Sequence, residues 1–465
     1  MRGAMRRVAY VLVAVIGVLA VWLTVQQVVA GSRYADDPRN PRARPADDRR
    51  GTITTADGVV VAEDIDGVRR YPLGGDYLQV VGYDLQDGAA GLESSRAVDL
   101  SPLEEGSITS WLFGVFGGSP EPPQMGLTVV DALQQSALDG LAGRPGAVVA
   151  IDPRTGAVLA YASSPSLDPN DLVDGTRSLA DLGDDPGSLD RAAFLLLPAG
   201  STFKILVAAA ALEAGMTPDT EFEDLPEYLA PGAGLPIGNA GGGSCVAGAG
   251  ITLREALVVS CNTVFASLAV DLGGEAVVGV TERAGFNTTL PFELGAAISS
   301  IPTAAALDAD PGALAQTGIG ERDLRVTPLQ MAVIVAGIGN GGVMMKPYVV
   351  EVVSTGDGST IDATGAARWG RVVSPEIASE LASMMADVVA DGTGRAARRD
   401  DVIVAGKTGT AEGGGGPHAW FIGFAPADDP TIAIAVVVQG GGSGGAVAAP
   451  IAAGVFEAWF GIRNP

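Results

Sequence analysis

The chain has 465 residues, of which 47% are apolar and 18% are charged, so it is long enough for two folded domains and is not a disordered polymer. Its formal net charge of −25 argues against nucleic-acid binding, because phosphate contacts require a basic surface. The single histidine, His418, excludes a multi-histidine metal site, and any Ser-His-Asp triad would have to use it. No cofactor and no metal site are expected.

The N-terminus predicts a membrane anchor. Arginines within residues 1–7 precede an uncharged apolar run from Val8 to Val25, which is long enough to cross a bilayer. The arginines place residues 1–7 in the cytoplasm and the rest of the chain outside it. Small residues at 28–30 resemble a cleavage site, so a cleaved signal peptide is the alternative. The length of the apolar run favours an uncleaved single-pass anchor over residues 8–30.

Residues 31–143 predict a small extracytoplasmic domain. The segment 34–50 is rich in Asp, Arg and Pro and is typical of a tether or an extended arm. Apolar residues on both sides of the Asp57-Gly58 turn then predict two β-strands. Because the rest is rich in turns and poor in reactive side chains, we expect a β-rich pedestal (dimerisation-like domain) below a catalytic unit at residues 144–465.

The catalytic unit alternates helices with strands. Strands that follow helices predict an α/β or α+β domain, with an antiparallel sheet flanked by helices. Helices are expected at 129–141, 207–212, 261–272 and 446–460, and strands at 146–152, 157–163, 349–353, 402–407, 419–424 and 431–438.

Three short motifs carry candidate chemistry. They are Ser201-Thr202-Phe203-Lys204, Ser260-Cys261-Asn262 and Lys407-Thr408-Gly409-Thr410. In the first, the hydroxyl and the amine are one helical turn apart and can meet, which gives the serine a neighbouring base. Each motif alone is a weak signal, since S-x-x-K or S-x-N arises by chance about once in a chain of this length. However, the chain has only three lysines, and two of them fall in these motifs.

The chemistry of acyl transfer explains these residue types. Burial beside Lys407 should lower the pKa of Lys204, which could then take the proton of Ser201. Ser260 could pass a proton to a leaving amine, while Asn262 orders the network and holds a substrate amide.

The third motif is typical of an edge strand. Its backbone could pair with an extended peptide, and its lysine and hydroxyls could hold a carboxylate. The backbone amides of Ser201 and Thr410 are candidates for an oxyanion hole.

The ordered motifs resemble the signature of the penicillin-binding protein and serine β-lactamase superfamily, S-x-x-K, S-x-N and K-T-G. The similarity to class B penicillin-binding proteins extends beyond the motifs. With its single anchor and short pedestal, the chain most resembles the penicillin-binding protein A group of actinobacteria, which is part of class B. The segments that carry the resemblance are RRGTI at 49–53, GLE at 91–93, LTVVDALQ at 127–134, AIDPRTGAVLAYASSPSLDPN at 150–170, TGIGERDLRVTPLQMA at 317–332 and HAWFIGFAP at 418–426.

The resemblance implies a peptidoglycan D,D-transpeptidase. Ser201 would attack the D-Ala-D-Ala bond of a stem peptide, release D-Ala and pass the acyl group to a stem amine. Penicillins would acylate the same serine. The resemblance also implies a partner that polymerises glycan, because no segment of the chain resembles a glycosyltransferase domain. This partner would belong to the shape, elongation, division and sporulation family. The catalytic residues would be Ser201, Lys204, Ser260, Asn262 and Lys407, and the substrate-binding residues Thr408, Gly409 and Thr410.

Other functions use the same residues. In a D,D-carboxypeptidase or a β-lactamase, water replaces the acceptor amine. The anchor, the pedestal and the similarity outside the motifs argue against both. A non-catalytic β-lactam sensor or scaffold is the third possibility. Intact Ser201, Lys204 and Lys407 argue against it, and the few residues before Val8 leave no room for a signalling domain.

Cys245 and Cys261 are the only cysteines, and the anchor would place them where disulfides persist. We expect them to pair and so to tie the glycine-rich loop 239–245 to the second motif; two free thiols are the alternative. For His418 we expect a structural or surface role, because a lysine base makes a histidine unnecessary.

Overall fold

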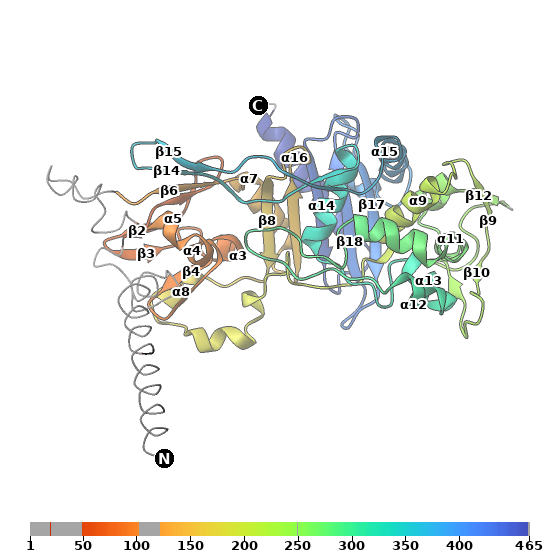
Figure 1. Ribbon diagram of the computed structural model, residues 1–465, viewed down its shortest axis with the longest axis horizontal. Helices are drawn as coiled ribbons and strands as arrows, with labels where there is room; N and C mark the ends of the chain where they lie inside the picture. The colour runs from red at the N-terminus through yellow and green to blue at the C-terminus, as the bar shows by residue number, and fades with distance from the viewer. Residues whose placement is uncertain (1–18, 20–48, 102–120, 249, 464–465) are drawn as a thin grey trace, which may run out of the picture.

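The structure is a computed structural model that describes residue 19 and residues 49–101, 121–248 and 250–463. These residues form an elongated molecule with the sheet that contains the N-terminal strands at one end, a five-stranded sheet in the middle and a group of helices at the other end (Figure 1). Except for Leu19, the expected cytoplasmic tail at 1–7 and the expected anchor at 8–30 lie outside the described residues.

The central sheet is antiparallel throughout, with β17 at one edge. This is the antiparallel sheet that the sequence predicts, and it places the third motif on an edge strand. The strands lie in the order β17 (Ala405–Ala411), β18 (His418–Ala425), β19 (Ile432–Val438), β7 (Gly146–Ile151) and β8 (Val158–Ser164).

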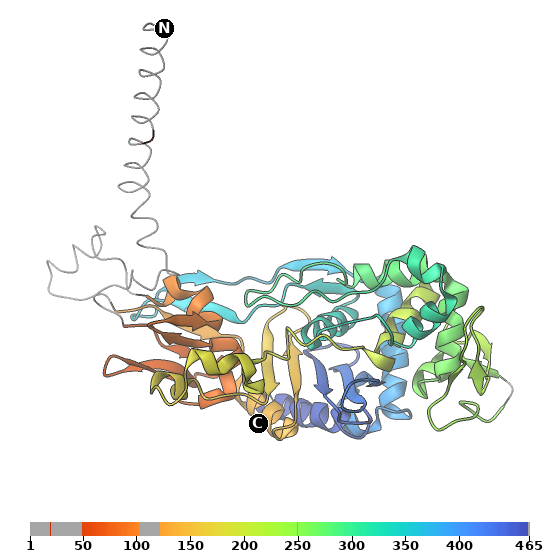
Figure 2. The same cartoon turned by 90° about the horizontal axis from the view of Figure 1, so that it is seen from below.

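Helices cover both faces of this sheet, because successive residues of a strand point to opposite faces and both sets are apolar here. Val148 and Phe421 pack with helices α7 (Asp131–Leu141) and α16 (Ala448–Arg463), whereas Val149 and Trp420 pack on the side of α14 (Pro328–Gly339). Figure 2 shows α16, in blue, and α14, in teal, on opposite sides of the sheet. The prediction of a sheet flanked by helices is therefore confirmed.

The helical end of the molecule supports the first two motifs. Helix α11 packs against α9 and α13, and it is the one helix among the described residues whose length and composition would allow it to cross a membrane. It is a helix of the domain interior, and Gly273 interrupts it with φ of 81°, at the point where the sequence predicts that the helix ends. The helices are α9 (Lys204–Glu213), α10 (Leu253–Val258), α11 (Asn262–Arg283), α12 (Ala304–Asp308), α13 (Pro311–Gly318) and α15 (Pro375–Ala390).

The N-terminal sheet does not follow the expected division of the chain at residue 143. Two of its strands come from far along the sequence, and α7, which the prediction assigns to the pedestal, packs on the central sheet instead. The sequence could not show this, because strand pairing over such a separation leaves no local pattern. The sheet has the order β15 (Thr360–Ala363), β14 (Val350–Ser354), β6 (Gln124–Leu127), β1 (Ile53–Thr54), β2 (Val60–Ile65) and β3 (Val68–Arg70).

A buried ionic cluster holds the first described residues of the pedestal. The Glu93 carboxylate is fully buried and accepts hydrogen bonds from Arg50 Nη1 at 2.5 Å and Arg69 Nε at 2.6 Å. Arg50 also pairs with Asp84 at 3.1 Å. Since a buried charge is tolerated only with such partners, the RRG and GLE segments depend on one another. The remaining elements are α3 (Leu78–Val81), β4 (Tyr83–Leu85), β5 (Gly88–Ala90), α4 (Gly91–Ser95), α5 (Ala97–Leu100), α8 (Pro169–Val173), β9 (Glu221–Glu223), β10 (Glu227–Tyr228), β11 (Ile237–Gly238), β12 (Gly250–Thr252), β13 (Val343–Met345) and β16 (Arg368–Arg371).

Candidate active site

Ser201 and Lys204 lie on a single continuous turn. A short 3-10 helix, η4 (Gly200–Phe203), leads directly into α9, whose first residue is Lys204. The lysine side chain is fully buried, while Ser201 is partly exposed. Lys204 Nζ donates to Ser260 O at 2.7 Å, to Ser260 Oγ at 3.2 Å and to Asn262 Oδ1 at 2.7 Å. Within the described part of the chain, its hydrogen bonds therefore go to the second motif and not to the hydroxyl of Ser201.

Glycines allow the backbone to approach Ser201 closely from two sides. Gly200 has φ of 53°, a left-handed conformation that favours glycine, and its amide donates to Gly320 O at 2.9 Å. A Cβ on Gly200 would lie 2.6 Å from Thr410 O, and one on Gly320 would lie 1.9 Å from Gly200 O. The turn that carries Ser201 is therefore held between the TGIG segment and strand β17.

The second motif forms the connection between α10 and α11. Ser260 has φ of 62°, a conformation that costs a residue with a side chain on the order of 1 kcal/mol and that occurs mostly where function requires it. Its hydroxyl lies between two amines, 3.2 Å from Lys204 Nζ and 2.8 Å from Lys407 Nζ. Ser260 is thus placed to connect the two lysines.

The electrostatics of the two lysines favour proton transfer. Burial and the nearby charge of Lys407 hold the pKa of Lys204 well below its usual value, and burial lowers the pKa of Lys407 to about 7. Among the described residues, no carboxylate lies within ion-pair distance of either amine; their partners are hydroxyl, amide and carbonyl oxygens. Both amines therefore release a proton more readily than an exposed lysine, and Lys204, which follows Ser201 on the same turn, is the one suited to act as a general base.

Strand β17 brings the third motif beside Ser201. A Cβ on Gly409 would lie 2.9 Å from Thr202 Cγ2, so only glycine fits where the strand crosses η4. Thr408 is buried and its Oγ1 lies 2.6 Å from Thr393 Oγ1, whereas Thr410 is exposed. The structure thus brings the three motifs together around one point, as the sequence predicts.

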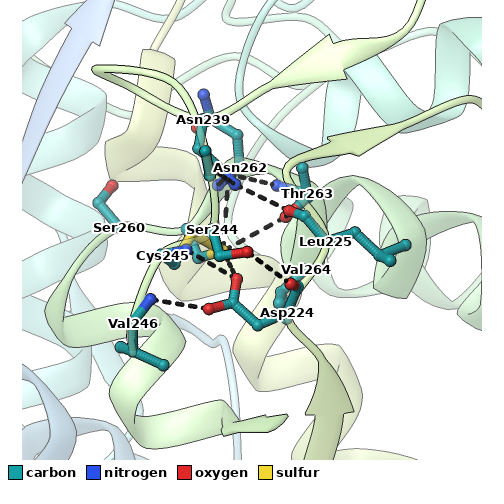
Figure 3. Close-up of a disulfide and its surroundings, with 12 residues drawn as sticks. Asp224, Leu225, Asn239, Ser244, Cys245, Val246, Ser260, Asn262, Thr263 and Val264 are labelled. Atoms are coloured by element: carbon teal, nitrogen blue, oxygen red, sulfur yellow. Dashed lines mark hydrogen bonds between the residues drawn. A yellow bond between two sulfur atoms is a disulfide. The ribbon is translucent and has the colours of Figure 1, made fainter. Parts of the chain in front are cut away.

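A disulfide and an asparagine hold the second motif from behind (Figure 3). Cys245 and Cys261 form a disulfide with a Cα–Cα distance of 5.7 Å. Cys261 gives α11 no side-chain cap; instead, Asn239 Oδ1 accepts hydrogen bonds from the amides of Asn262 and Thr263, both at 3.0 Å. These are the first two amides of the helix, which lack partners within it. The loop before Cys245 therefore caps the helix that presents Asn262.

The same loop also orients the Asn262 side chain. Asn262 Nδ2 donates to Gly238 O at 3.0 Å, so its Oδ1 is directed at Lys204. The buried Asp224 carboxylate accepts from the amides of Cys245 at 2.8 Å and Val246 at 2.7 Å. Asp224 and the two cysteines are the one cluster of possible metal ligands in the described ranges, and the disulfide occupies both sulfurs.

His418 has a structural position. It is the first residue of β18, only 3% of its surface is exposed, and its Nδ1 accepts a hydrogen bond from the amide of Gly440 at 3.1 Å. Burial lowers its pKa, which favours the neutral ring that this bond requires. The structural role expected from the sequence fits this geometry.

Sequence reasoning missed three residues that hold the site, Asn239, Gly320 and Thr393. Asn239 lies in the glycine-rich loop and Gly320 in the TGIG segment, both of which the sequence analysis singles out. However, no local sequence pattern indicates which of the three motifs these residues support. Thr393 lies between two glycines ahead of the third motif, in a segment with no recognisable pattern.

Comparisons with known proteins agree with this geometry. Residues 146–457 match the family model described as penicillin binding protein transpeptidase domain. The chain is 37% identical to the peptidoglycan D,D-transpeptidase PbpA of Mycolicibacterium smegmatis, over 97% of each chain. It is 36% identical to PbpA of Mycobacterium tuberculosis, over 98% of this chain and 99% of that protein.

Solved structures give the same result. The ceftriaxone acyl-enzyme complex of penicillin-binding protein A from M. tuberculosis superposes with a TM-score of 0.82 at 34% identity, covering 88% of this chain and 98% of that one. The D,D-transpeptidase domain of an Eggerthella lenta peptidoglycan glycosyltransferase superposes with a TM-score of 0.80 at 34% identity, covering 90% and 100%. The predicted resemblance to class B penicillin-binding proteins, and among them to penicillin-binding protein A, is confirmed. The chain belongs to the penicillin-binding protein transpeptidase family.

Proposed function

We propose that this protein is a peptidoglycan D,D-transpeptidase with Ser201 as its nucleophile. The observation that carries the proposal is the arrangement of Lys204 and Lys407 around Ser260, buried and without a carboxylate partner in the described residues, next to the turn of Ser201. The names of the mycobacterial relatives support the reaction. The solved acyl-enzyme complexes of M. tuberculosis penicillin-binding protein A with ceftriaxone, imipenem and penicillin G support β-lactam binding.

The geometry is suited to acylation in the following way. Lys204, as a free amine, takes the Ser201 proton while Oγ attacks the carbonyl carbon of the penultimate D-Ala. The oxyanion receives hydrogen bonds from the amides of Ser201 and Thr410. As the C–N bond breaks, Ser260 passes a proton to the leaving nitrogen of D-Ala, and Lys204 replaces that proton. Lys407 supplies the positive charge that attracts the terminal carboxylate, with the hydroxyls of Thr408 and Thr410 beside it.

Deacylation runs the same groups in reverse. A stem amine attacks the ester carbonyl and gives its proton to Ser260, which passes a proton to Lys204. Lys204 returns a proton to Ser201 as its Oγ leaves. Asn262 and β17, an edge strand of the central sheet, hold the donor peptide, which can add to the sheet as a further strand. β-Lactams follow the acylation half of this path.

The cellular setting belongs to the same proposal. Residues 1–7 would be cytoplasmic and residues 8–30 the single-pass anchor of the plasma membrane. The pedestal expected at residues 31–143 would be completed by β14 and β15, and the transpeptidase domain expected at residues 144–465 would include α7. The enzyme would act outside the membrane, in cell-wall synthesis for cell shape or cell division. It would work beside a glycan polymerase of the shape, elongation, division and sporulation family. The resemblance and the apolar N-terminal run support this arrangement.

A donor peptide ending in D-Ala-D-Ala tests the reaction. The full chain in detergent is incubated with the donor, with and without an acceptor amine, and both D-Ala release and cross-linked product are measured. We expect cross-linked product that requires both the acceptor and Ser201. D-Ala release without cross-linking, at a rate that the acceptor does not change, would indicate a D,D-carboxypeptidase and contradict the proposal.

A further inference from the structure

We propose that Thr393 is a positioning residue for the carboxylate of the substrate, acting through the hydroxyl of Thr408. Neither the motifs nor the mechanism above uses Thr393. The inference rests on the proposed function, since it concerns how the same site recognises a terminal carboxylate.

The loop of Thr393 is fixed between the second and third motifs. It follows α15 and precedes the 3-10 turn η5 (Arg395–Ala397) that leads toward β17. The Thr393 amide donates to Val258 O at 3.3 Å, at the end of α10 and two residues before Ser260. A Cβ on the neighbouring Gly392 would lie 2.3 Å from the same carbonyl, so the loop is pressed against that helix. Its carbonyl side is equally confined, because a Cβ on Gly445 would lie 2.6 Å from Thr393 O.

The two hydroxyls have one proton more than their mutual bond uses. Thr393 Oγ1 and Thr408 Oγ1 lie 2.6 Å apart, and either oxygen can be the donor. Neither hydroxyl has another hydrogen-bond partner among the described residues. Each threonine brings one O–H group, so whichever donates to the other, the second proton remains available. A pair of hydroxyls in this state is a donor for an incoming acceptor.

The surroundings show which acceptor fits. Lys407 Nζ lies 3.1 Å from the carbonyl oxygen of Thr408, so positive charge stands beside the pair. Thr408 is buried, with 6% of its surface exposed, whereas Thr393 is exposed, so the pair lies at the boundary between solvent and the interior beside the third motif. A carboxylate bound here would take one charge-assisted hydrogen bond from a hydroxyl and the attraction of the ammonium group. When Thr393 donates to Thr408, the Thr408 proton is the one directed at the carboxylate.

Exchange of Thr393 for valine tests this, because valine keeps the shape and removes the hydroxyl. The full chain in detergent is titrated with penicillin G, which carries a carboxylate, and the acylation rate is measured against concentration. We expect Thr393→Val to lower the acylation efficiency about tenfold, the range for loss of a hydrogen bond to a charged group. Thr393→Val should raise the penicillin G concentration that gives half of the maximal acylation rate. It should change the maximal rate itself by less. Thr393→Ser should stay within about threefold of the wild type, because it restores the hydroxyl.

A double-mutant cycle separates positioning from a general structural effect. In the Thr408→Val background, Thr393→Val should have no further effect, since Thr393 acts only through Thr408. Thr355→Val, in the distant hairpin between β14 and β15, is the matched control and should leave acylation unchanged. Additive losses, an unaltered efficiency in Thr393→Val, or equal losses in the serine and valine variants would each overturn the inference. Failure of the wild type to label at Ser201 would instead refute the proposed function.

Discussion

Lys407 Nζ lies 2.8 Å from Ser260 Oγ, in a site where both lysine side chains of the motifs are fully buried. The amine has a pKa of about 7 in the folded protein and about 10.5 when exposed. Between these values the unfolded chain binds a proton that the native chain has released, so the stability contributed by this group rises with pH across that window. Near and below pH 7, keeping Lys407 in place costs folding free energy.

Lys407→Met should therefore be more stable than the wild type and much less active. We expect a gain in unfolding free energy on the order of 2–4 kcal/mol at pH 6–7 that shrinks toward pH 10. Acylation should fall by roughly a hundredfold, because the charge is lost. Thermal unfolding at pH 6, 8 and 10 measures the first effect. Lys346→Met, at the one lysine outside the motifs, is exposed and should show neither effect. A gain that does not change with pH would contradict this account.

Asn239 caps the helix that presents Asn262, so Asn239→Ala should lower both stability and acylation. Loss of the shared cap costs about 1–2 kcal/mol by analogy with ordinary N-caps. Asn239→Asp keeps the acceptor oxygen but loses the Nδ2 hydrogen bonds to the carbonyls of Leu225 and Gly243, both at 3.0 Å, so it should recover only part of the stability. Chemical unfolding and penicillin acylation of both variants are the measurements. If the alanine variant matched the wild type in both, the cap would have no role in placing the second motif.

The Cys245–Cys261 disulfide closes a loop with a sequence separation of 16 residues. Loop-closure entropy predicts that replacing both cysteines with serine costs about 3 kcal/mol. The unfolding midpoint of the double variant should fall, and a reducing agent should lower the midpoint of the wild type but not that of the variant. Equal midpoints for the oxidised wild type and the double variant would refute the stabilising role.

Gly200 is required by the close approach of Thr410. Gly200→Ala should lower acylation by at least tenfold, because the Cβ would meet Thr410 O at 2.6 Å and Gly200 has a positive φ. The control is Gly414→Ala in the loop between β17 and β18, where a Cβ meets nothing within 4 Å. Rates of penicillin acylation compare the two. A larger effect at Gly414 than at Gly200 would show that the packing around the serine turn is not what limits the reaction.

The chemistry of this site was accessible from the sequence because its motifs are short and local. The spacing of Ser201 and Lys204 on one turn, and the small number of lysines, led to the reactive groups without any knowledge of the fold. Continuous apolar runs of strand length likewise predicted the strands of the central sheet, since a strand buried on both faces is apolar at successive positions.

The contacts that hold these groups were not accessible, because they join segments far apart in the chain. Asn239 caps a helix that begins more than twenty residues later, and Thr393 meets Thr408 across a turn that has no motif. The long-range addition of β14 and β15 to the N-terminal sheet was missed for the same reason. The sequence places Ser201 and Lys204 one helical turn apart, where they can meet, but it does not show that the hydrogen bonds of Lys204 Nζ go to Ser260 and Asn262.

Covalent labelling by a fluorescent penicillin tests the central claim most directly. The wild type and Ser201→Ala are incubated with the probe, the adduct is located by peptide mass spectrometry, and its release is followed over time. We predict a single long-lived adduct on Ser201 and none in the variant. Equal labelling of Ser201→Ala, or an adduct on another residue, would contradict the assignment of the nucleophile, and rapid release of the label would identify a β-lactamase instead.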